Sequence, residues 1–400
     1  MHEKIATLVA ALLVVAATSA GMRATPGITA RVIGIQGGRL PALDGLRGVL
    51  VLSVLLHHGF LTRAMAAPGD WPTEQSRFVE QLGSAAVAIF FMISAFLFGG
   101  RLLRDGGRLD VVRLAIGRTM RIVPLYLIAI ALFVGIAMIA EGGLQVPAGK
   151  LLRSTGRWLA FDFVPKYEVN GFPDGLRVMG QIWTLRWEWL FYFCLPAMGW
   201  AFRWLRGAWA AYALLAIVAI TFSPLFWLFL AGLAVSQVAT LRHRWAGVAW
   251  QFGAVAGLLV LFRSYNLSRD WPQALLLVPT LTAAIRNDGV FAVLSRPVVR
   301  FLGEISYSFY LLHGIVLYVA TEWVIGMDAF RSFDTFGFAF AMAGVGIATV
   351  ILSTGTFLLV ERPAMRLFHS RPVPRNLEMW IGWAMRRSWR VKRAGSVEPS

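Results

Sequence analysis

Long runs of apolar residues, separated by short polar segments, recur along almost the whole chain. Many of these runs approach or exceed about 18 residues, the length that an α-helix needs to cross the hydrocarbon core of a bilayer. Backbone N–H and C=O groups in lipid must be paired within their own segment, so we expect helices. The pattern predicts an all-α, polytopic membrane bundle of about ten transmembrane helices, at residues 46–66, 82–103, 119–140, 182–204, 207–222, 223–240, 245–263, 272–286, 304–327 and 333–360.

The composition favours one membrane domain. Apolar residues make up 58% of the 400 residues and charged residues only 15%, whereas about a quarter of a soluble domain is charged. We expect the membrane domain at 40–368, an N-terminal extension at 1–39 and a basic tail at 369–400. Residues 5–20 form an apolar run of signal-peptide length. This run is a signal, an anchor, or a stretch upstream of a true start at Met22.

The formal net charge is +17. In a soluble protein such a charge would suggest a nucleic-acid partner. Here we expect none, because Lys and Arg collect in the cytoplasmic loops of membrane proteins. Arginines recur in the loops on one side of the predicted spans and acidic residues in those on the other, which predicts that both termini are cytoplasmic. The longest outside loop, about 141–181, is either a contact surface for an external acceptor or a plain connector.

The first predicted span carries an arginine and a histidine on one face. Arg47 and His58 are eleven residues apart, which is close to three turns and a rise of about 16 Å. His57 points about a quarter turn away. Titratable groups inside a span are costly and suggest function, and an imidazole can take a proton from a hydroxyl near neutral pH. The alternative is a histidine that only forms a hydrogen bond between helices.

Two further groups of charged residues stand at the ends of predicted spans. Arg118 and Arg121 open the third span on one face, where they either bind phosphates or act as a positive-inside anchor. Trp183, Arg186 and Glu188 begin the fourth span at its outer end. This position predicts a carboxylate on the outside, together with tryptophans that either mark the interface or stack on a sugar.

The ninth span contains a second intramembrane imidazole, His313. Glu361 and Arg362 close the last span, and we expect them to form an ion pair with each other. The single cysteine, Cys194, predicts neither a disulfide nor a thiolate cluster. The sequence has no HExxH, phosphate loop, CxxC or GxSxG motif and no compact set of metal ligands. We therefore expect no metal and no resident cofactor.

Together, these segments resemble the acyltransferase-3 family of membrane O-acyltransferases. The likeness rests on six motifs in the family's order, at residues 40–48 with His58, 90–97, 118–124, 183–188 with Phe191 and Tyr192, 303–313 and 361–363. Each motif is weak alone. Their order, on spans of matching number, makes the resemblance specific over about 40–366.

The resemblance implies a bacterial inner-membrane enzyme that transfers an acyl group, commonly acetyl, from cytoplasmic acyl-CoA to a hydroxyl of an extracytoplasmic glycan or glycolipid. His58 would then be the general base, and Arg47 would position it or the donor. The implied roles of the other residues are CoA phosphate binding for Arg118 and Arg121, an acceptor-side role for Glu188, acceptor contacts for Trp183 and Arg186, and support of the site for His313.

Besides the membrane lipid, the partners implied are acyl-CoA as donor substrate and the glycan acceptor. Direct transfer and a covalent acyl-histidine both remain open at this point. The competing interpretation is a transporter or flippase of a lipid-linked glycan, because buried charges also occur in that class. No two-fold repeat of interrupted helices supports it in this sequence.

Overall fold

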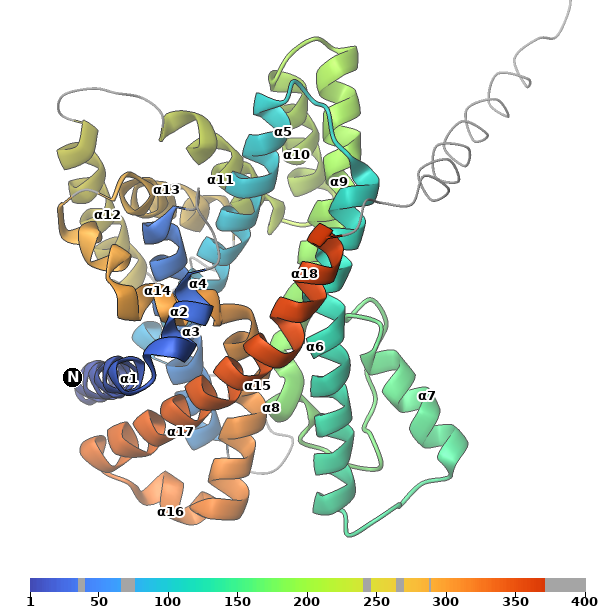
Figure 1. The fold of residues 1–400 in the computed structure, drawn as a ribbon, viewed down its shortest axis with the longest axis vertical. Helices are drawn as coiled ribbons and strands as arrows, with labels where there is room; N and C mark the ends of the chain where they lie inside the picture. The colour runs from blue at the N-terminus through green and yellow to red at the C-terminus, as the bar shows by residue number, and fades with distance from the viewer. Residues whose placement is uncertain (35–39, 66–75, 240–245, 264–269, 288, 371–400) are drawn as a thin grey trace, which may run out of the picture.

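The computed structural model describes residues 1–34, 40–65, 76–239, 246–263, 270–287 and 289–370 (Figure 1). Most of these residues are helical, and within these ranges there is no β-strand, so the all-α prediction is confirmed. The α-helices are α1 (His2–Ala24), α2 (Pro26–Ile33), α3 (Pro41–Ala64), α4 (Arg77–Ser94), α5 (Gly100–Arg104), α6 (Val111–Ala140), α7 (Ala148–Trp158), α8 (Gly175–Met179), α9 (Trp183–Trp204), α10 (Trp209–Thr221), α11 (Phe226–Val238), α12 (Ala246–Arg263), α13 (Trp271–Arg286), α14 (Pro297–Glu304), α15 (Ser306–Val319), α16 (Met327–Ser332), α17 (Thr335–Thr356) and α18 (Arg362–Ser370). Shorter 3₁₀ or π segments are η1 (Ala95–Gly99), η2 (Gly180–Ile182), η3 (Gly289–Ser295), η4 (Ala320–Val324) and η5 (Phe357–Glu361).

Five helices of the described chain are long and apolar enough to cross a membrane, or up to seven if each of two bent pairs is one span. The prediction of a multi-pass membrane bundle is thus confirmed, but the count of ten is not. α10 and α11 have 13 residues each, which gives each a length of about 20 Å. The hydrocarbon core is roughly 30 Å thick, so neither helix spans it alone.

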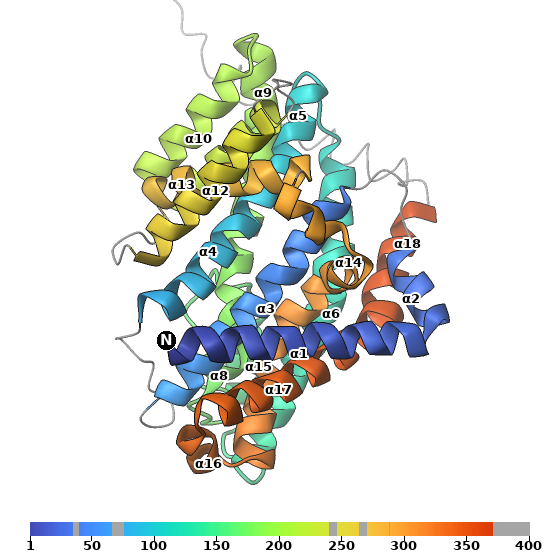
Figure 2. The same ribbon diagram turned by 90° about the vertical axis from the view of Figure 1, so that its left-hand side faces the viewer.

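The N-terminal run forms a helix of the bundle. α1 is 23 residues long and is one of the five candidate spans. It lies alongside α17 (Figure 2) and buries Ala6, Ala10, Val14 and Thr18, one residue per turn. At its start, His2 Nδ1 lies 3.0 Å from Thr335 Oγ1 in α17. Residue 2 and α18 therefore lie at opposite ends of α17, whereas the charge pattern predicts both termini on one side.

The predicted ninth span is divided in two. α14 and α15 meet at a bend of 72°, and Glu304 belongs to α14 rather than to α15. Just before the bend, a Cβ on Gly303 would lie 1.7 Å from the carbonyl oxygen of Asp44 in α3. The glycine therefore allows α14 to pack backbone against backbone on α3, a small-residue contact common between membrane helices. α3 also packs on α4 and α15, so it lies at the centre of the helices that carry the predicted site.

The segment before α9 enters the bundle. α8 and η2 are largely buried, and Gln181 Nε2 donates a hydrogen bond to the carbonyl oxygen of Leu311, midway along α15 (2.9 Å). A Cβ on Gly314 of α15 would lie 2.5 Å from the carbonyl oxygen of Val178. The first residue of α9, Trp183, packs edge-on against Phe91, near the middle of the continuous helix Arg77–Arg104 that α4, η1 and α5 form, with ring centroids 6.4 Å apart. α9 therefore begins deep in the bundle and not at its outer surface.

Candidate functional site

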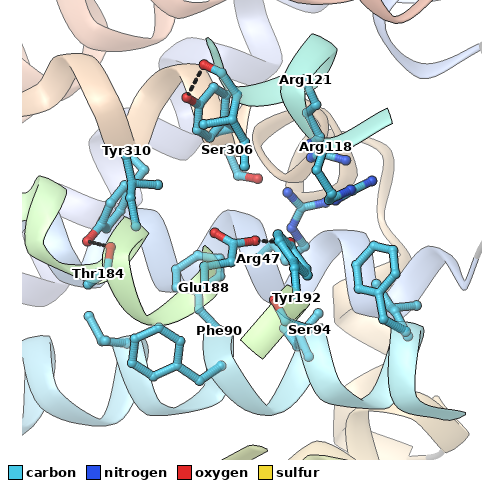
Figure 3. A pocket seen from close by; sticks show the side chains of 18 of the residues that line it. Arg47, Phe90, Ser94, Arg118, Arg121, Thr184, Glu188, Tyr192, Ser306 and Tyr310 are labelled. Atoms are coloured by element: carbon cyan, nitrogen blue, oxygen red, sulfur yellow. Dashed lines mark hydrogen bonds between the residues drawn. The ribbon is translucent and has the colours of Figure 1, made fainter. Parts of the chain in front are cut away.

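A cavity of about 360 Å³ lies between α3, α4, α6, α9 and α15 (Figure 3). We call it the arginine cavity, because four arginines of the described chain line it: Arg47, Arg101, Arg118 and Arg121. Glu188 is the carboxylate in its described lining. Apolar side chains from α4 and η1 form another wall, including Phe90, Phe91, Ile93, Leu97 and Phe98. The cavity thus joins a cationic surface to an apolar one.

Aromatic rings hold Arg118 in place. Its guanidinium carbon lies 4.4 Å from the ring centre of Phe98 and 5.7 Å from that of Tyr192. The hydroxyl of Tyr192 donates a hydrogen bond to Glu188 Oε1. A guanidinium stacked on aromatic rings keeps its planar donors available to a ligand. Phe98 and Tyr192 are site residues that the sequence prediction missed, although Tyr192 stands four residues after Glu188 and so shares its helix face.

Arg121 pairs with a carboxylate from the end of the chain. Its Nε lies 3.8 Å from Oε1 of Glu361, which is 1% exposed. Glu361 Oε2 also accepts a hydrogen bond from Ser308 Oγ (2.9 Å). The predicted ion pair between Glu361 and Arg362 is wrong. Glu361 ends the π-helical segment η5, and its carboxylate contacts α6 and α15 instead.

Glu188 lines the arginine cavity together with Arg118 and Arg121, whereas the sequence predicted a carboxylate at the outer end of the fourth span. Because α9 begins deep in the bundle, a residue one turn into α9 reaches the level of Arg118 on α6. Trp183 and Arg186 are not among the described residues that line this cavity. Trp183 packs on Phe91, and the guanidinium carbon of Arg186 lies 5.2 Å from the ring centre of Trp187. Trp183 therefore contacts another helix of the bundle.

The two predicted histidines meet. His58 Nδ1 lies 2.8 Å from His313 Nε2, and His313 Nδ1 lies 2.6 Å from the carbonyl oxygen of Tyr310. His313 is fully buried. His57 instead forms a hydrogen bond between its Nδ1 and the carbonyl oxygen of Val79 (2.8 Å). The structure therefore brings His58 and His313 together and turns His57 toward α4.

The hydrogen bonds determine where the protons lie. A backbone carbonyl only accepts, so His313 Nδ1 carries a hydrogen. In the neutral ring, His313 Nε2 then holds a lone pair, and His58 Nδ1 must donate to it. By elimination, the lone pair of a neutral His58 is on Nε2. The chain from Tyr310 through His313 orients His58 as a base, in the way that a partner orients the histidine of a catalytic triad.

Tyr310 separates the histidines from the arginine cavity. Its ring lines the cavity, 5.9 Å from the ring of His313 between centroids. Its hydroxyl donates to the carbonyl oxygen of Gln181 (2.9 Å) and lies 2.9 Å from Thr184 Oγ1. Neither His58 nor His313 is among the described lining residues. The sequence prediction missed Tyr310, although it stands three residues before His313.

Comparison with known proteins identifies the family. The sequence model of the acyltransferase-3 family, described as an acyltransferase domain, matches residues 40–358. The chain belongs to the acyltransferase-3 family. It is similar to nodulation protein 10 of Rhizobium leguminosarum bv. viciae, with 25% identity over 379 residues, which cover 83% of this chain and 95% of that protein. No solved structure gave a significant match.

As a member of this family, the protein is a membrane acyltransferase, and the enzyme prediction is confirmed at this level. The matched region contains all the described lining residues of the arginine cavity and both members of the histidine pair. α1, α18 and Glu361 lie outside it. The family match favours the enzyme over the alternative of a glycan transporter.

Proposed function

We propose that this acyltransferase moves an acyl group, with acetyl as the simplest case, from acyl-CoA to a hydroxyl of an extracytoplasmic carbohydrate or glycolipid. The observation that supports the proposal is the arginine cavity, which lies beside an oriented pair of histidines. We assign the protein to a bacterial inner membrane. The arginine-rich end of the bundle faces the cytoplasm, in agreement with the positive-inside rule.

The arginine cavity suits the donor. CoA carries phosphates at one end and a less polar pantetheine arm that ends in the thioester. Guanidinium groups bind phosphate oxygens through paired donors, and Arg101, Arg118 and Arg121 supply them. Arg101 is mostly exposed at the mouth, with 76% of its side chain accessible. Leu97 and Phe91 offer an apolar surface for the arm.

The acceptor hydroxyl attacks the thioester carbon directly. His58 Nε2 takes the hydroxyl proton as the new C–O bond forms, the C–S bond breaks, and the same proton passes to the CoA thiolate. His313 keeps His58 in the tautomer that this step needs. Because Tyr310 lies between the cavity and the histidines, the thioester has to pass its ring. Glu188 acts on the donor side, where it holds Tyr192 against Arg118.

The test is acyl transfer by the full-length protein in membrane vesicles that contain labelled acetyl-CoA. We expect label in the surface glycan with wild type and none with His58→Ala. Mass spectrometry of surface glycans from cells with and without the protein identifies the acyl group and the sugar. Glycan movement across the membrane that does not depend on acetyl-CoA, without any acyl product, would overturn the proposal and support the transporter.

A further inference from the structure

A second cavity of about 440 Å³ lies at the other end of α3. We call it the α1 cavity, since His2, Glu3 and Ala6 of α1 line it together with Phe60, Arg63 and Ala64 of α3, Ser76 and Val79 at the start of α4, and Thr335 of α17. α1 precedes the region that matches the family. This cavity is therefore built partly from a helix outside the matched domain.

The two cavities are separated along the same helices. Arg47 and Phe60 are thirteen residues apart on α3, a rise of about 20 Å. α4 likewise contributes Val79 to the α1 cavity and Ser94, at its other end, to the arginine cavity. If the arginine cavity opens to the cytoplasm, as in the proposed function, the α1 cavity opens on the opposite face.

His57 and His58 lie on α3 between Arg47 of the arginine cavity and Phe60 of the α1 cavity. His58 precedes Phe60 by two residues, which is about 3 Å along the helix axis but about 200° around it, so the two side chains leave α3 on different sides. Val79, which lines the α1 cavity, accepts the hydrogen bond of His57, and the rings of His57 and His58 are 5.3 Å apart between centroids. Val79 and His57 thus connect the α1 cavity to the proposed base, although neither His57 nor His58 is among the described lining residues.

The chemistry of the two linings differs. The arginine cavity is cationic, as a polyanionic donor requires. Among its described lining residues, the α1 cavity has one guanidinium, Arg63, and one carboxylate, Glu3, whose charges balance. The imidazole of His2, the hydroxyls of Ser76 and Thr335 and the ring of Phe60 also line it. Paired donors and acceptors beside an aromatic ring suit a neutral polyhydroxylated ligand, and they offer little to a multiply charged one.

We propose that the α1 cavity binds the carbohydrate acceptor and that α1 contributes directly to its recognition. This inference rests on the proposed function, which requires an acceptor hydroxyl to reach His58 from the face opposite the donor. The polar contacts already present hold the cavity in shape: Ser76 Oγ donates to Glu3 Oε2 (2.5 Å), and Arg63 donates to the carbonyl oxygen of Phe333. A sugar hydroxyl would join or replace these bonds.

The test compares Glu3→Gln, Arg63→Gln and Thr335→Val in cells that lack the wild-type copy. We expect acylation of surface glycan, measured by mass spectrometry, to fall about ten-fold for each charge variant, because a hydrogen bond to a charged group is lost. Hydrolysis of acetyl-CoA by the purified variants, with water in place of the sugar, should stay at the wild-type level. Lys4→Gln, an exposed neighbour on α1, is the matched control.

The outcomes separate the two proposals. If the variants acylate glycan at the wild-type rate, the acceptor assignment is overturned while the proposed function stands. If wild type produces no acylated glycan and does not hydrolyse acetyl-CoA, the proposed function itself fails. Loss of acetyl-CoA hydrolysis in the variants, at unchanged thermal stability, would also overturn the assignment, because the cavity would then serve the donor step.

Discussion

At the scale of single residues, the histidine pair gives His313 a positioning role that a merely structural residue would not have. Asn in its place can accept from His58 Nδ1 and donate to the carbonyl oxygen of Tyr310, whereas Leu can do neither. We expect His313→Leu to lower kcat by about 100-fold, the usual scale for a disabled general base, and His313→Asn to recover part of this loss. The measurement is acetyl transfer at saturating acetyl-CoA.

Two results would contradict this role. One is equal activity of His313→Asn and His313→Leu, at equal amounts of folded protein. The other is a rise in KM for acetyl-CoA without a change in kcat, since that result would assign His313 to donor binding.

A separate prediction concerns the role of Arg118 in binding the acyl-CoA donor. Its guanidinium is stacked on Phe98 and Tyr192, so Lys cannot reproduce both its stacking and its fork of donors. We expect Arg118→Ala to raise KM for acetyl-CoA about ten-fold or more through loss of a charge-assisted contact, and Arg118→Lys to lie between Ala and wild type. Arg113, which is exposed five residues earlier on α6, provides the control variant Arg113→Ala.

At the scale of elements, the close helix crossings near the site depend on glycines, which have no side chain to keep the two backbones apart. A Cβ on Gly303 of α14 would lie 1.7 Å from the backbone of α3, whereas a Cβ on Gly344 of α17 would meet nothing within 4 Å. Gly303→Ala should destabilise the protein by about 1–3 kcal/mol, as overpacking does, and lower its melting temperature in detergent. Gly344→Ala is the matched control, and equal melting of the two variants would refute the close crossing.

The periodicity and length of the apolar runs predicted the long continuous helices. The spans predicted at 46–66, 82–103 and 119–140 correspond to α3, the continuous α4–α5 and α6. Periodicity and apolar length could not predict how deep in the bundle α9 begins. It depends on contacts between distant segments, such as Gln181 with Leu311, and no local pattern encodes these. For this reason Glu188 was expected at the outer face and lies in the arginine cavity.

The same distinction applies to the site. Arg47 and His58 lie on one helix, so helical geometry alone placed them on one face. The partners of His58 and Arg121 come from α15 and η5, far away in the chain. Adjacency suggested Arg362 as the partner of Glu361, but a buried carboxylate pairs with the cation that packing brings to it. The candidate residues were recognisable from sequence, whereas their pairing was not.

At the scale of the whole molecule, the two cavities and the charge distribution predict how the bundle is oriented across the membrane. Arg108 lies in the exposed turn before α6, at the arginine-rich end. Leu152 of α7, which is 75% exposed, lies in the long loop at the other end of α6. The proposed orientation places the first in the cytoplasm and the second outside.

This orientation can be measured by cysteine labelling, because replacing the single cysteine, Cys194, leaves a chain without any other thiol. In a Cys194→Ser background, a membrane-impermeant maleimide applied to intact cells should label Leu152→Cys and not Arg108→Cys, and inverted vesicles should give the reverse. Lys4→Cys is the decisive position, because α1 begins beside the starts of α4 and α17. We expect it to react from outside, like Leu152→Cys. If Lys4→Cys instead reacts on the same side as Arg108→Cys, α1 does not cross beside α17, and the α1 cavity cannot receive an acceptor from outside.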